Sequence, residues 1–248
     1  MKVVVIGASS GLGRCIGVRL GQRGEQVALL ARRRDRLVEA AAEAGPGTLA
    51  ITCDVTDESS CRAAIDEAAT GLEGIDALVY ATGIGPLGRL VDLDAATWRR
   101  AFDTNVTGAA LVTAAAVPHL TASGGVATFL SSVSASFTPP WPGLAAYLVS
   151  KAALDKLVEA FRAEHPSIGF TRIVVGDCAG GDGASMTEFN ADWDMAIAAE
   201  FYPVWMQRNY MNGSLLDVED LLDVVEAVLH CRGTIPSVTV TPRAPREA

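Results

Sequence analysis

Short apolar runs alternate with longer amphipathic stretches along most of the chain. Because the runs are continuously apolar, we expect strands that are buried on both faces. They are Val3–Ile6, Val27–Ala31, Leu49–Thr52, Ala77–Tyr80, Val126–Leu130, Ile168–Val175 and Val238–Val240. The alanine-rich stretches between them predict helices at Leu12–Arg23, Arg34–Ala44, Asp57–Thr70, Asn105–Leu120, Leu144–Glu164 and Val218–His230. This alternation indicates right-handed βαβ units and one parallel sheet.

Two segments interrupt the alternation. Phe137–Leu144 is too rich in proline for the interior of a helix or sheet. Gly180–Ser214 is long and rich in methionine and aromatic residues, and it has no clear strand. We expect residues 180–214 to form a lid over a substrate site, with a surface excursion that covers core as the alternative. Residues 1–248 are predicted to be a single domain, and 241–248 a flexible tail.

Composition narrows the classes of partner. The chain has 248 residues, 50% of them hydrophobic, and a net charge of −9. That charge argues against nucleic acid or an anionic membrane surface as the main partner. No apolar run approaches the roughly 18 residues of a membrane span, and the N-terminal run is too short for a secretory signal. Five scattered cysteines and three isolated histidines predict no disulfide framework and no metal, which fits a cytoplasmic protein.

A glycine-rich turn, Gly7 to Gly13, follows the first strand and opens the first helix. Gly7 permits a tight exit, Gly11 lets the backbone approach a pyrophosphate, and Gly13 allows close packing of helix on sheet. The helix N-terminus offers free N–H groups to phosphates, and Ser9 and Ser10 add hydroxyl donors. The strand–turn–helix context favours a dinucleotide site over a merely structural turn.

Cations stand at the end of the second strand, where an NAD site would carry an acid. Arg32, Arg33 and Arg34 occupy this stretch. A carboxylate would hold the ribose 2′-hydroxyl of NAD, whereas arginine binds a 2′-phosphate. We therefore expect NADP(H), with Arg32 as the leading contact, Arg33 as support and Arg14 as an additional one. The alternative, a solvated cluster at a helix start, is disfavoured because the helix dipole repels cations there.

Tyr147 and Lys151 are four residues apart on a predicted helix, so they share one face. A phenol is a poor acid–base group at neutral pH, and a neighbouring ammonium should lower its pKa. The pair alone is a weak signal, because an aromatic helix residue beside a surface lysine is common. Ser132 strengthens it, since it ends the fifth strand, at the edge where open α/β sheets bind ligands.

Jointly these motifs resemble the short-chain dehydrogenase/reductase family from Val3 to about Val175. The glycine spacing is that of the family, although Ile6 replaces the usual threonine. The resemblance implies a Rossmann-type doubly wound parallel sheet of about seven strands with helices on both faces. It also implies no metal, and hydride transfer between a nicotinamide cofactor and an alcohol or carbonyl.

The same resemblance implies a catalytic set of Asn105, Ser132, Tyr147 and Lys151. Tyr147 would exchange the hydroxyl proton, and Ser132 would donate to the substrate oxygen. Asn105 would hold a water in the relay to Lys151, with a helix cap as its alternative role. Ser134 gives the commoner family spacing to Tyr147, but it lies past the strand end, so Ser132 is preferred.

Further cofactor contacts also follow from the resemblance. Asp54 and Val55 should contact the adenine, while Asp54 or Thr56 can also cap the next helix. The stretch after the fourth strand should line the cofactor, although it lacks the family's two asparagines. Asp177, in place of the usual Pro-Gly, should lie near the nicotinamide. The predicted cofactor set is Gly7, Ser9, Ser10, Gly11, Leu12, Gly13, Arg32, Arg33, Asp54, Val55, Ala81, Thr82, Gly83, Tyr147, Lys151 and Asp177.

The two interrupting segments should supply the substrate pocket. Its predicted residues are Trp141, Met186, Phe189, Trp193 and Trp205. A mostly apolar wall is the ordinary composition of a ligand pocket. The longer segment also holds five acids against one cation, Arg208; the acids are Asp182, Glu188, Asp192, Asp194 and Glu200. We expect a neutral, largely hydrophobic carbonyl substrate, because an anionic one would be repelled.

The leading hypothesis is an NADP(H)-dependent oxidoreductase. The alternatives are an NADP-binding regulator without turnover and a structural subunit of an oligomer. The complete catalytic set favours the enzyme, since a sensor needs only the glycine-rich turn. In the family, the helices corresponding to Asn105–Leu120 and Leu144–Glu164 form a dimer interface, so a homodimer or homotetramer is expected.

Overall fold

The computed structural model describes residues 1–208, 210 and 214–243, with Ser136 described by its backbone alone. Seven parallel strands form one sheet in the order β3-β2-β1-β4-β5-β6-β7. They are β1 (Lys2–Ile6), β2 (Gln26–Ala31), β3 (Leu49–Thr52), β4 (Ala77–Tyr80), β5 (Val126–Ser132), β6 (Gly169–Val175) and β7 (Ser237–Val240). The expected sheet of about seven strands is confirmed.

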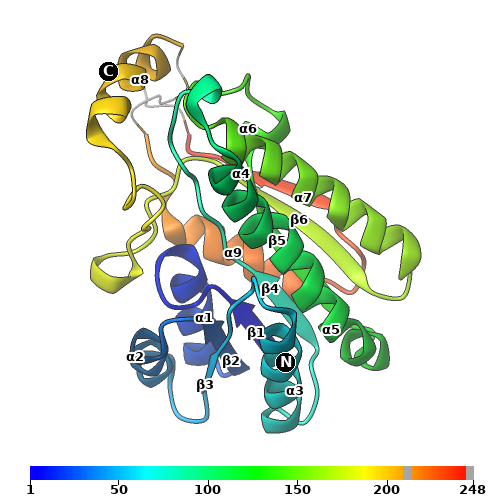
Figure 1. Cartoon of the computed structure of the whole chain (residues 1–248). Helices are drawn as coiled ribbons and strands as arrows, with labels where there is room; N and C mark the ends of the chain where they lie inside the picture. Colours follow the sequence, from blue (N-terminus) through cyan, green and yellow to red (C-terminus); the bar gives the residue numbers. More distant parts are fainter. Residues whose placement is uncertain (209, 211–213, 244–248) are drawn as a thin grey trace.

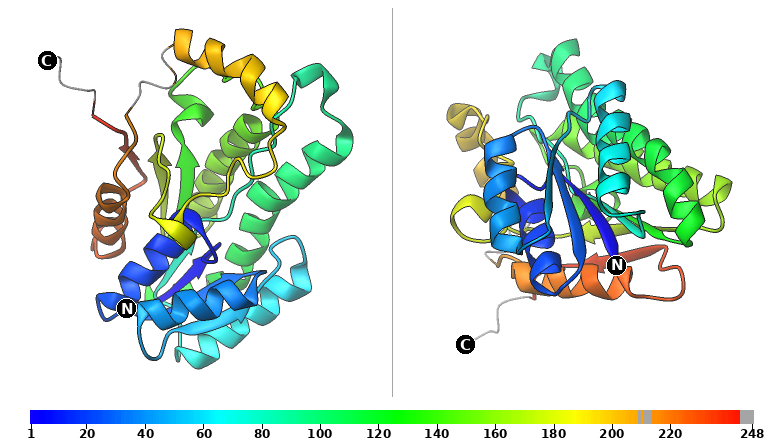
Figure 2. Two further views of the ribbon diagram at one scale, coloured as in Figure 1. Left: turned by 90° about the vertical axis from the view of Figure 1, so that its left-hand side faces the viewer. Right: turned by 90° about the horizontal axis from the view of Figure 1, so that it is seen from below.

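Helices cover both faces of the sheet (Figures 1 and 2). One face carries α1 (Gly11–Gln22), α2 (Arg34–Ala44) and α9 (Val218–Leu229). The other carries α3 (Glu58–Gly71), α5 (Gly108–Ser123) and α7 (Ala145–Glu164). The chain therefore forms a single doubly wound domain of Rossmann type.

Burial on both faces explains the continuously apolar strands. In β1, Val3 and Val5 pack under α1 and α2, whereas Val4 and Ile6 belong to the cluster on the opposite face. All four side chains are fully buried. Each such burial stabilises the fold by about 1.5–3 kcal/mol, so a polar side chain at any of these four positions would be costly.

Three α-helices and two 3₁₀ helices were not expected from the sequence. The predicted helix Asn105–Leu120 is part of a longer run that includes α4 (Ala95–Phe102) and a π-helical segment, η2 (Asp103–Thr107). This run begins earlier because Asp94 caps it, its carboxylate accepting from the Thr97 N–H at 2.7 Å. The other two are the short α6 (Val133–Ser136) after β5 and α8 (Met195–Gln207) inside the predicted lid, and α8 is capped by Asp194. One-turn 3₁₀ helices occupy Leu90–Asp92 and Gly183–Ser185.

One helical run among the described residues, Ala95–Ser123, is long and apolar enough by composition to cross a membrane. A single such run is weak evidence for a span, because core helices pass the same test. Within it, α5 buries Ala109, Val112 and Ala116 against the sheet. A third of its apolar window is buried, so its outer face stays open to solvent.

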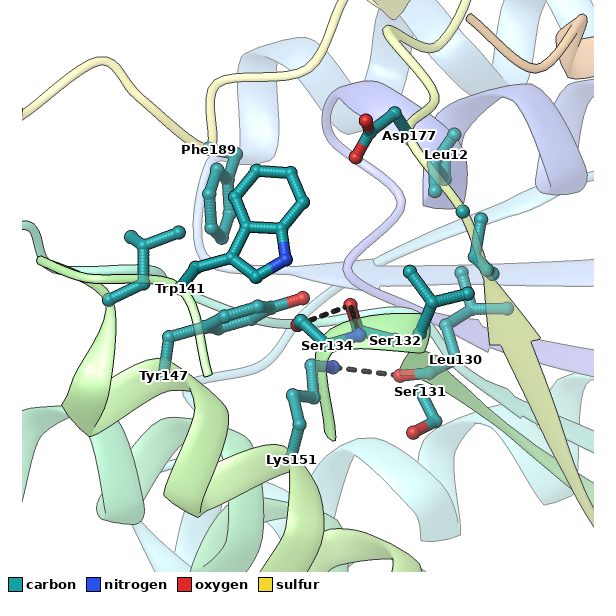
Figure 3. A pocket seen from close by; sticks show the side chains of 14 residues that line it. Leu12, Leu130, Ser131, Ser132, Ser134, Trp141, Tyr147, Lys151, Asp177 and Phe189 are labelled. Carbon is teal, nitrogen blue, oxygen red and sulfur yellow. Dashed lines mark hydrogen bonds between the residues drawn. The ribbon is translucent and has the colours of Figure 1, made fainter. Parts of the chain in front are cut away.

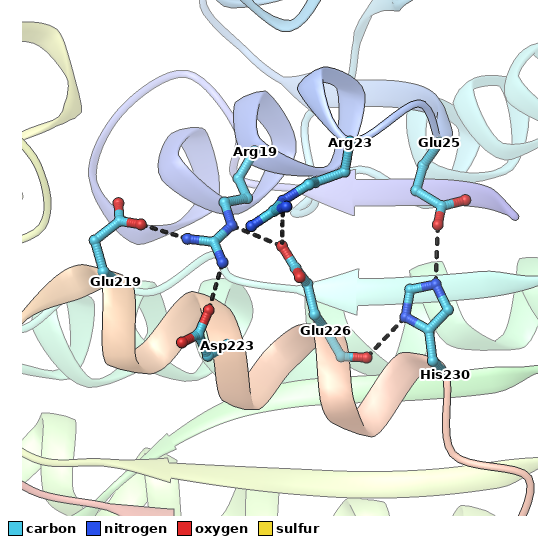
Figure 4. Close-up of polar contacts among 7 residues, drawn as sticks. All are labelled: Arg19, Arg23, Glu25, Glu219, Asp223, Glu226 and His230. Carbon is cyan, nitrogen blue, oxygen red and sulfur yellow. Dashed lines mark hydrogen bonds and ion pairs between the residues drawn. The ribbon is translucent and has the colours of Figure 1, made fainter.

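Polar contacts tie the last helix to the first (Figure 4). Arg19 of α1 forms ion pairs with three acids of α9, namely Glu219, Asp223 and Glu226, the last at 2.7 Å. His230, just past α9, lies 2.9 Å from the Glu25 carboxylate. These contacts fix α9, and with it the chain that leads into β7.

Candidate functional site

The sheet order changes direction between β1 and β4, so the loops that follow these strands diverge and leave a crevice at their carboxyl ends. A cavity of about 430 Å³ lies there over the glycine-rich turn. A smaller one, of about 190 Å³, opens beside Tyr147 at the end of β5 (Figure 3). Phe189 lines both cavities. The glycine-rich turn therefore lies at one end of the crevice, and titratable side chains lie at the other.

The glycine-rich turn leaves donors free for an anion. Gly7 has a φ of +87°, and a Cβ there would stand 2.7 Å from Thr82 Oγ1. A Cβ on Gly13 would stand 2.4 Å from the Gly7 carbonyl oxygen, so helix and strand need glycine to pack this closely. Ser10 is the N-cap residue of α1, but its side chain accepts no hydrogen bond from the N–H groups of the helix, and the first turn holds no acid. The open N–H groups and the positive end of the helix fit a pyrophosphate.

The predicted arginines lie beside this turn. Arg32 lines the larger cavity and has no hydrogen bond or ion pair with any described residue. Arg33 also lines it and donates to Ser9 Oγ at 2.9 Å and Ser10 Oγ at 2.8 Å. Arg14 does not line it. Its guanidinium is buried between α1 and α2, where it donates to the Arg36 carbonyl oxygen and to the Glu43 carboxylate.

Most predicted cofactor residues line one of the two cavities. Asp54, Val55, Thr82 and Gly83 line the larger one with Gly7, Ser9, Ser10 and Gly11, whereas Leu12 and Asp177 line the smaller one. Gly13 and Ala81 line neither and pack helix against strand. Residues that sequence reasoning did not select also line the larger cavity, among them Cys53, Thr56, Ile84, Thr104, Thr187, Glu188, Ala191 and Asp192. The four of these residues that follow β6 belong to no sequence motif that would indicate a role in the site.

Tyr147, Ser132 and Lys151 converge on the smaller cavity (Figure 3). Ser132 ends β5, and its hydroxyl lies 2.7 Å from that of Ser134, so both serines considered from the sequence are present. The Tyr147 and Ser132 side chains both line the cavity, and Lys151 Nζ lies 5.9 Å from the centroid of the Tyr147 ring. Lys151 Nζ donates to the Leu130 carbonyl oxygen at 2.7 Å. The Tyr147 phenol and the Ser132 hydroxyl therefore lie in the same cavity, where both could reach one substrate oxygen.

The pKa of Tyr147 corrects one expectation. Burial raises the pKa of Tyr147 to about 12, against a smaller lowering by the nearby Ser132 hydroxyl. The expected lowering by Lys151 does not prevail, because the ammonium is turned to the Leu130 carbonyl and burial lowers its own pKa to about 8. The pKa of Asp177, whose side chain enters the same cavity, is also raised by burial. In this arrangement Tyr147 is a protonated phenol at neutral pH.

Asn105 lies in the π-helical segment rather than at a helix cap, and it is fully buried. Its Nδ2 donates to the Ile84 carbonyl at 2.9 Å and to Ser150 Oγ at 2.8 Å, while its Oδ1 accepts from the Ile84 N–H. A Cβ on Gly83 would stand 3.3 Å from Lys151 Nζ and 3.6 Å from Asn105 Oδ1. The missing side chain at Gly83 thus leaves a small polar space between them.

The predicted substrate residues divide into three groups. Trp141 and Phe189 line the smaller cavity. Trp193 packs on Phe189 and donates from Nε1 to the Gly85 carbonyl oxygen, and Trp205 is buried behind Trp141 at a centroid distance of 5.8 Å. Met186 is 54% exposed and does not line the cavity. Two of the five predicted residues therefore line the smaller cavity directly.

Two of the five acids counted in the segment 180–214 are neutralised by ion pairs with arginines. Glu188 pairs with Arg33 and Arg36, and Glu200 pairs with Arg89. These cations come from other parts of the chain, so the segment's own count could not show them. The expected repulsion of anionic substrates is therefore weaker, because two of the five acids on which it was based are paired.

Known proteins share this architecture. The family model described as short chain dehydrogenase matches residues 1–193. An "11-beta-hydroxysteroid dehydrogenase A" of Sesamum indicum is 35% identical over 182 residues, which cover 71% of this chain and 52% of that protein. A "Cis-4-hydroxycyclohexanecarboxylate dehydrogenase" of Sinomonas cyclohexanicum is 34% identical over 187 residues, 70% of this chain and 75% of that one. The match thus spans about half the length of the hydroxysteroid dehydrogenase.

Solved structures agree on the fold. A short-chain type dehydrogenase/reductase of Mycobacterium marinum superimposes with a TM-score of 0.80 at 26% identity, covering 96% of this chain and 93% of that one. An alcohol dehydrogenase of Thermococcus sibiricus gives 0.80 at 21% identity, covering 99% and 98%. With the family model matching most of the chain, we conclude that this protein belongs to the short-chain dehydrogenase family of oxidoreductases.

Proposed function

We propose that the protein is an NADP(H)-dependent oxidoreductase that interconverts a neutral, largely hydrophobic carbonyl compound and its alcohol. The observation that supports the proposal is that one crevice holds both the candidate catalytic residues and the candidate cofactor-binding turn. Tyr147, Ser132 and Lys151 line one end. Arg32, which pairs with no residue that the structure describes, lies beside the glycine-rich turn at the other. A bound nicotinamide cofactor would supply the hydride exchanged with the substrate carbon.

The chain's own residues would handle the proton and the charge. The Tyr147 hydroxyl gives its proton to the carbonyl oxygen in reduction, and its raised pKa keeps it protonated and ready as an acid. Ser132 Oγ donates a hydrogen bond to the same oxygen as negative charge develops there. Lys151 and Asn105, on either side of the space at Gly83, hold the water that resupplies the proton.

The choice of NADP rests on Arg32 and Arg33. A 2′-phosphate carries close to two negative charges and accepts bidentate hydrogen bonds from guanidinium groups. β2 ends at Ala31, and the residue that follows it is Arg32 in place of an acid, so the 2′-hydroxyl of NAD would lack its usual acceptor at the end of this strand. The Arg32 guanidinium, which has no partner among the described residues, would make the first contact with the 2′-phosphate.

The substrate class rests on the smaller cavity. Trp141, Leu144 and Phe189 form an apolar wall opposite Tyr147. The relatives named above act, by their names, on a hydroxysteroid and a hydroxycyclohexanecarboxylate. Both compounds contain a ring, but the second is an anion, so the relatives support a ring-bearing substrate and the neutral class rests on the apolar wall alone. A ring-bearing ketone fits such a wall, with the described part of the predicted lid, residues 180–208 and 210, excluding water around it. Residues 209 and 211–213 of that prediction lie outside the described residues.

Cofactor use with matched substrates tests the proposal. We expect NADPH to be consumed with bulky neutral ketones at a higher kcat/KM than with charged acyl thioesters, and faster than NADH. Arg32→Glu should weaken NADP(H) at least about tenfold more than NAD(H), because the lost contact is to the 2′-phosphate alone. Arg34→Glu is the matched control, since Arg34 lies outside the cavity and donates to the Ala50 carbonyl. Equal loss of both dinucleotides, or NADPH binding without turnover across a broad panel, would contradict the proposal.

A further inference from the structure

The segment after β6 returns over the glycine-rich turn and brings a carboxylate to the arginines there. Thr187 lies so close that its Cα would be 3.4 Å from a Cβ on Gly11. The Thr187 N–H donates to the Ala179 carbonyl at 2.8 Å, which folds the segment back on itself. The next residue, Glu188, lines the larger cavity.

Glu188 uses both carboxylate oxygens on this cluster. Its Oε2 lies 2.5 Å from Arg33 Nη1 and accepts from Ser10 Oγ at 3.2 Å. Its Oε1 lies 2.5 Å from Arg36 Nη1. The hydrogen bond from Arg36, followed by that from Arg33, holds the pKa of Glu188 at about 2, so the group is ionised throughout the working range. A permanent negative charge thus lies on the two arginines beside Ser9 and Ser10.

The same segment continues to the catalytic end. Phe189 meets the Tyr147 ring edge-on at a centroid distance of 4.8 Å. It also fills the space over Gly85, where a Cβ would stand 2.0 Å from the Phe189 ring. Trp193 then packs on Phe189. Displacing Glu188 from its arginines would therefore loosen the contacts of Phe189 with Tyr147.

Building on the proposed function, we propose that Glu188 occupies the place of the cofactor's 2′-phosphate on Arg33 and Arg36 and competes with it. This makes Glu188 a specificity-determining residue that lowers affinity for NADP(H) and leaves NAD(H) unaffected. A phosphate displaces it because two negative charges and three oxygens pair better with guanidinium groups than one carboxylate does. Arg32, which has no described partner, makes the first contact while Glu188 still holds the other two arginines.

Binding of small probes tests this without any turnover. The probes are adenosine 2′-monophosphate and adenosine 5′-monophosphate, measured by calorimetry beside NADP⁺ and NAD⁺. Glu188→Gln should tighten the two ligands with a 2′-phosphate by about three- to tenfold, as expected for loss of exposed ion pairs. The other two ligands should change less than about twofold. Asp182→Asn removes one charge from the same segment away from the arginines and should change none of them.

Limited proteolysis within residues 180–208 gives a second readout. Adenosine 2′-monophosphate should speed cleavage in the native chain, whereas Glu188→Gln should be cleaved faster from the start. Unchanged affinities in Glu188→Gln, equal tightening of all four ligands, or weaker binding of NADP⁺ would each overturn the proposal. If the native chain prefers the 2′-phosphate probes and Glu188→Gln alters nothing, the inference fails while NADP use stands. If the native chain shows no such preference, the proposed cofactor fails with it.

Discussion

Lys151 keeps its ammonium in a nearly closed space, with 5% of the residue exposed. Burial lowers its pKa from 10.5 to about 8, and Asp155, one turn further along α7, opposes that shift. The folded pKa lies below the unfolded one, so the charged lysine destabilises the fold below pH 8. This cost fades as the pH rises towards 10.5, where the lysine is neutral in both states.

Lys151→Met should therefore be more stable than the native chain while losing activity. We expect a gain of about 1–3 kcal/mol in the free energy of unfolding at pH 7, because a buried charge is replaced by an apolar chain of similar length. The gain should shrink by pH 10. Urea unfolding of both proteins at the two pH values measures it, and a variant that is destabilised at pH 7 would show that the ammonium stabilises the fold.

Sequence reasoning found residues whose role is local and missed those whose partners are distant. Tyr147 and Lys151 were predictable because four residues make one helical turn. Glu188 was read as an unpaired acid because Arg33, its partner, lies 155 residues away. The raised pKa of Tyr147 was missed for a related reason: burial depends on Trp141, Phe189 and other side chains that no motif near Tyr147 places.

Among the elements, α1 and α9 are joined by one arginine and three acids (Figure 4). Glu219, Asp223 and Glu226 lie on one face of α9, and Arg19 satisfies all three while keeping 16% of its side chain exposed. Without Arg19 the three carboxylates would repel one another along the helix. The contact also supports β7, because α9 leads directly into it.

Arg19→Gln should lower the free energy of unfolding by about 1–2 kcal/mol, since a network is lost and like charges remain. Arg23→Gln is the control, because Arg23 is 63% exposed and stands 3.8 Å from Glu226. Thermal unfolding at low and high salt measures both. The loss in Arg19→Gln should be smaller at high salt, and equal small losses in the two variants would contradict the account.

Strands were easier to predict than the elements near the site. A strand that is buried on both faces can be predicted from a continuous run of apolar residues. The structure places β3 and β4 at the expected residues. By contrast, α8 lies in an aromatic-rich stretch with a proline at position 203, and its packing on Trp141 comes from another segment. The start of α4 depended on the Asp94 cap, a short-range signal that the apolar pattern overlooked.

At the scale of the whole molecule, α5 and α7 leave small residues on their outer faces. Ala114 of α5 and Ala152 of α7 are exposed on the helices that cover one face of the sheet. Small side chains allow a second copy to approach closely, and we propose that the chain forms a homodimer or homotetramer through this face.

Ala114→Arg should break such an assembly without unfolding the chain, because a charge would be buried between the copies. Light scattering at micromolar concentration should give a monomer for the variant and a dimer or tetramer for the native chain. Ala42→Arg, at an exposed site on α2 far from this face, should leave the assembly intact. A native chain that is monomeric would contradict the prediction.

The proposed reaction depends on proton transfer by the Tyr147 hydroxyl. Tyr147→Phe keeps the ring, and with it the packing on Phe189, and removes only the hydroxyl. The most direct test is the kcat of NADPH-dependent reduction of one neutral ketone by the variant, with NADPH affinity measured in parallel. We expect kcat to fall by about a hundred- to ten-thousandfold, the usual contribution of a general acid, while the affinity for NADPH changes less than about twofold. A variant that keeps most of the native kcat would contradict this role of Tyr147.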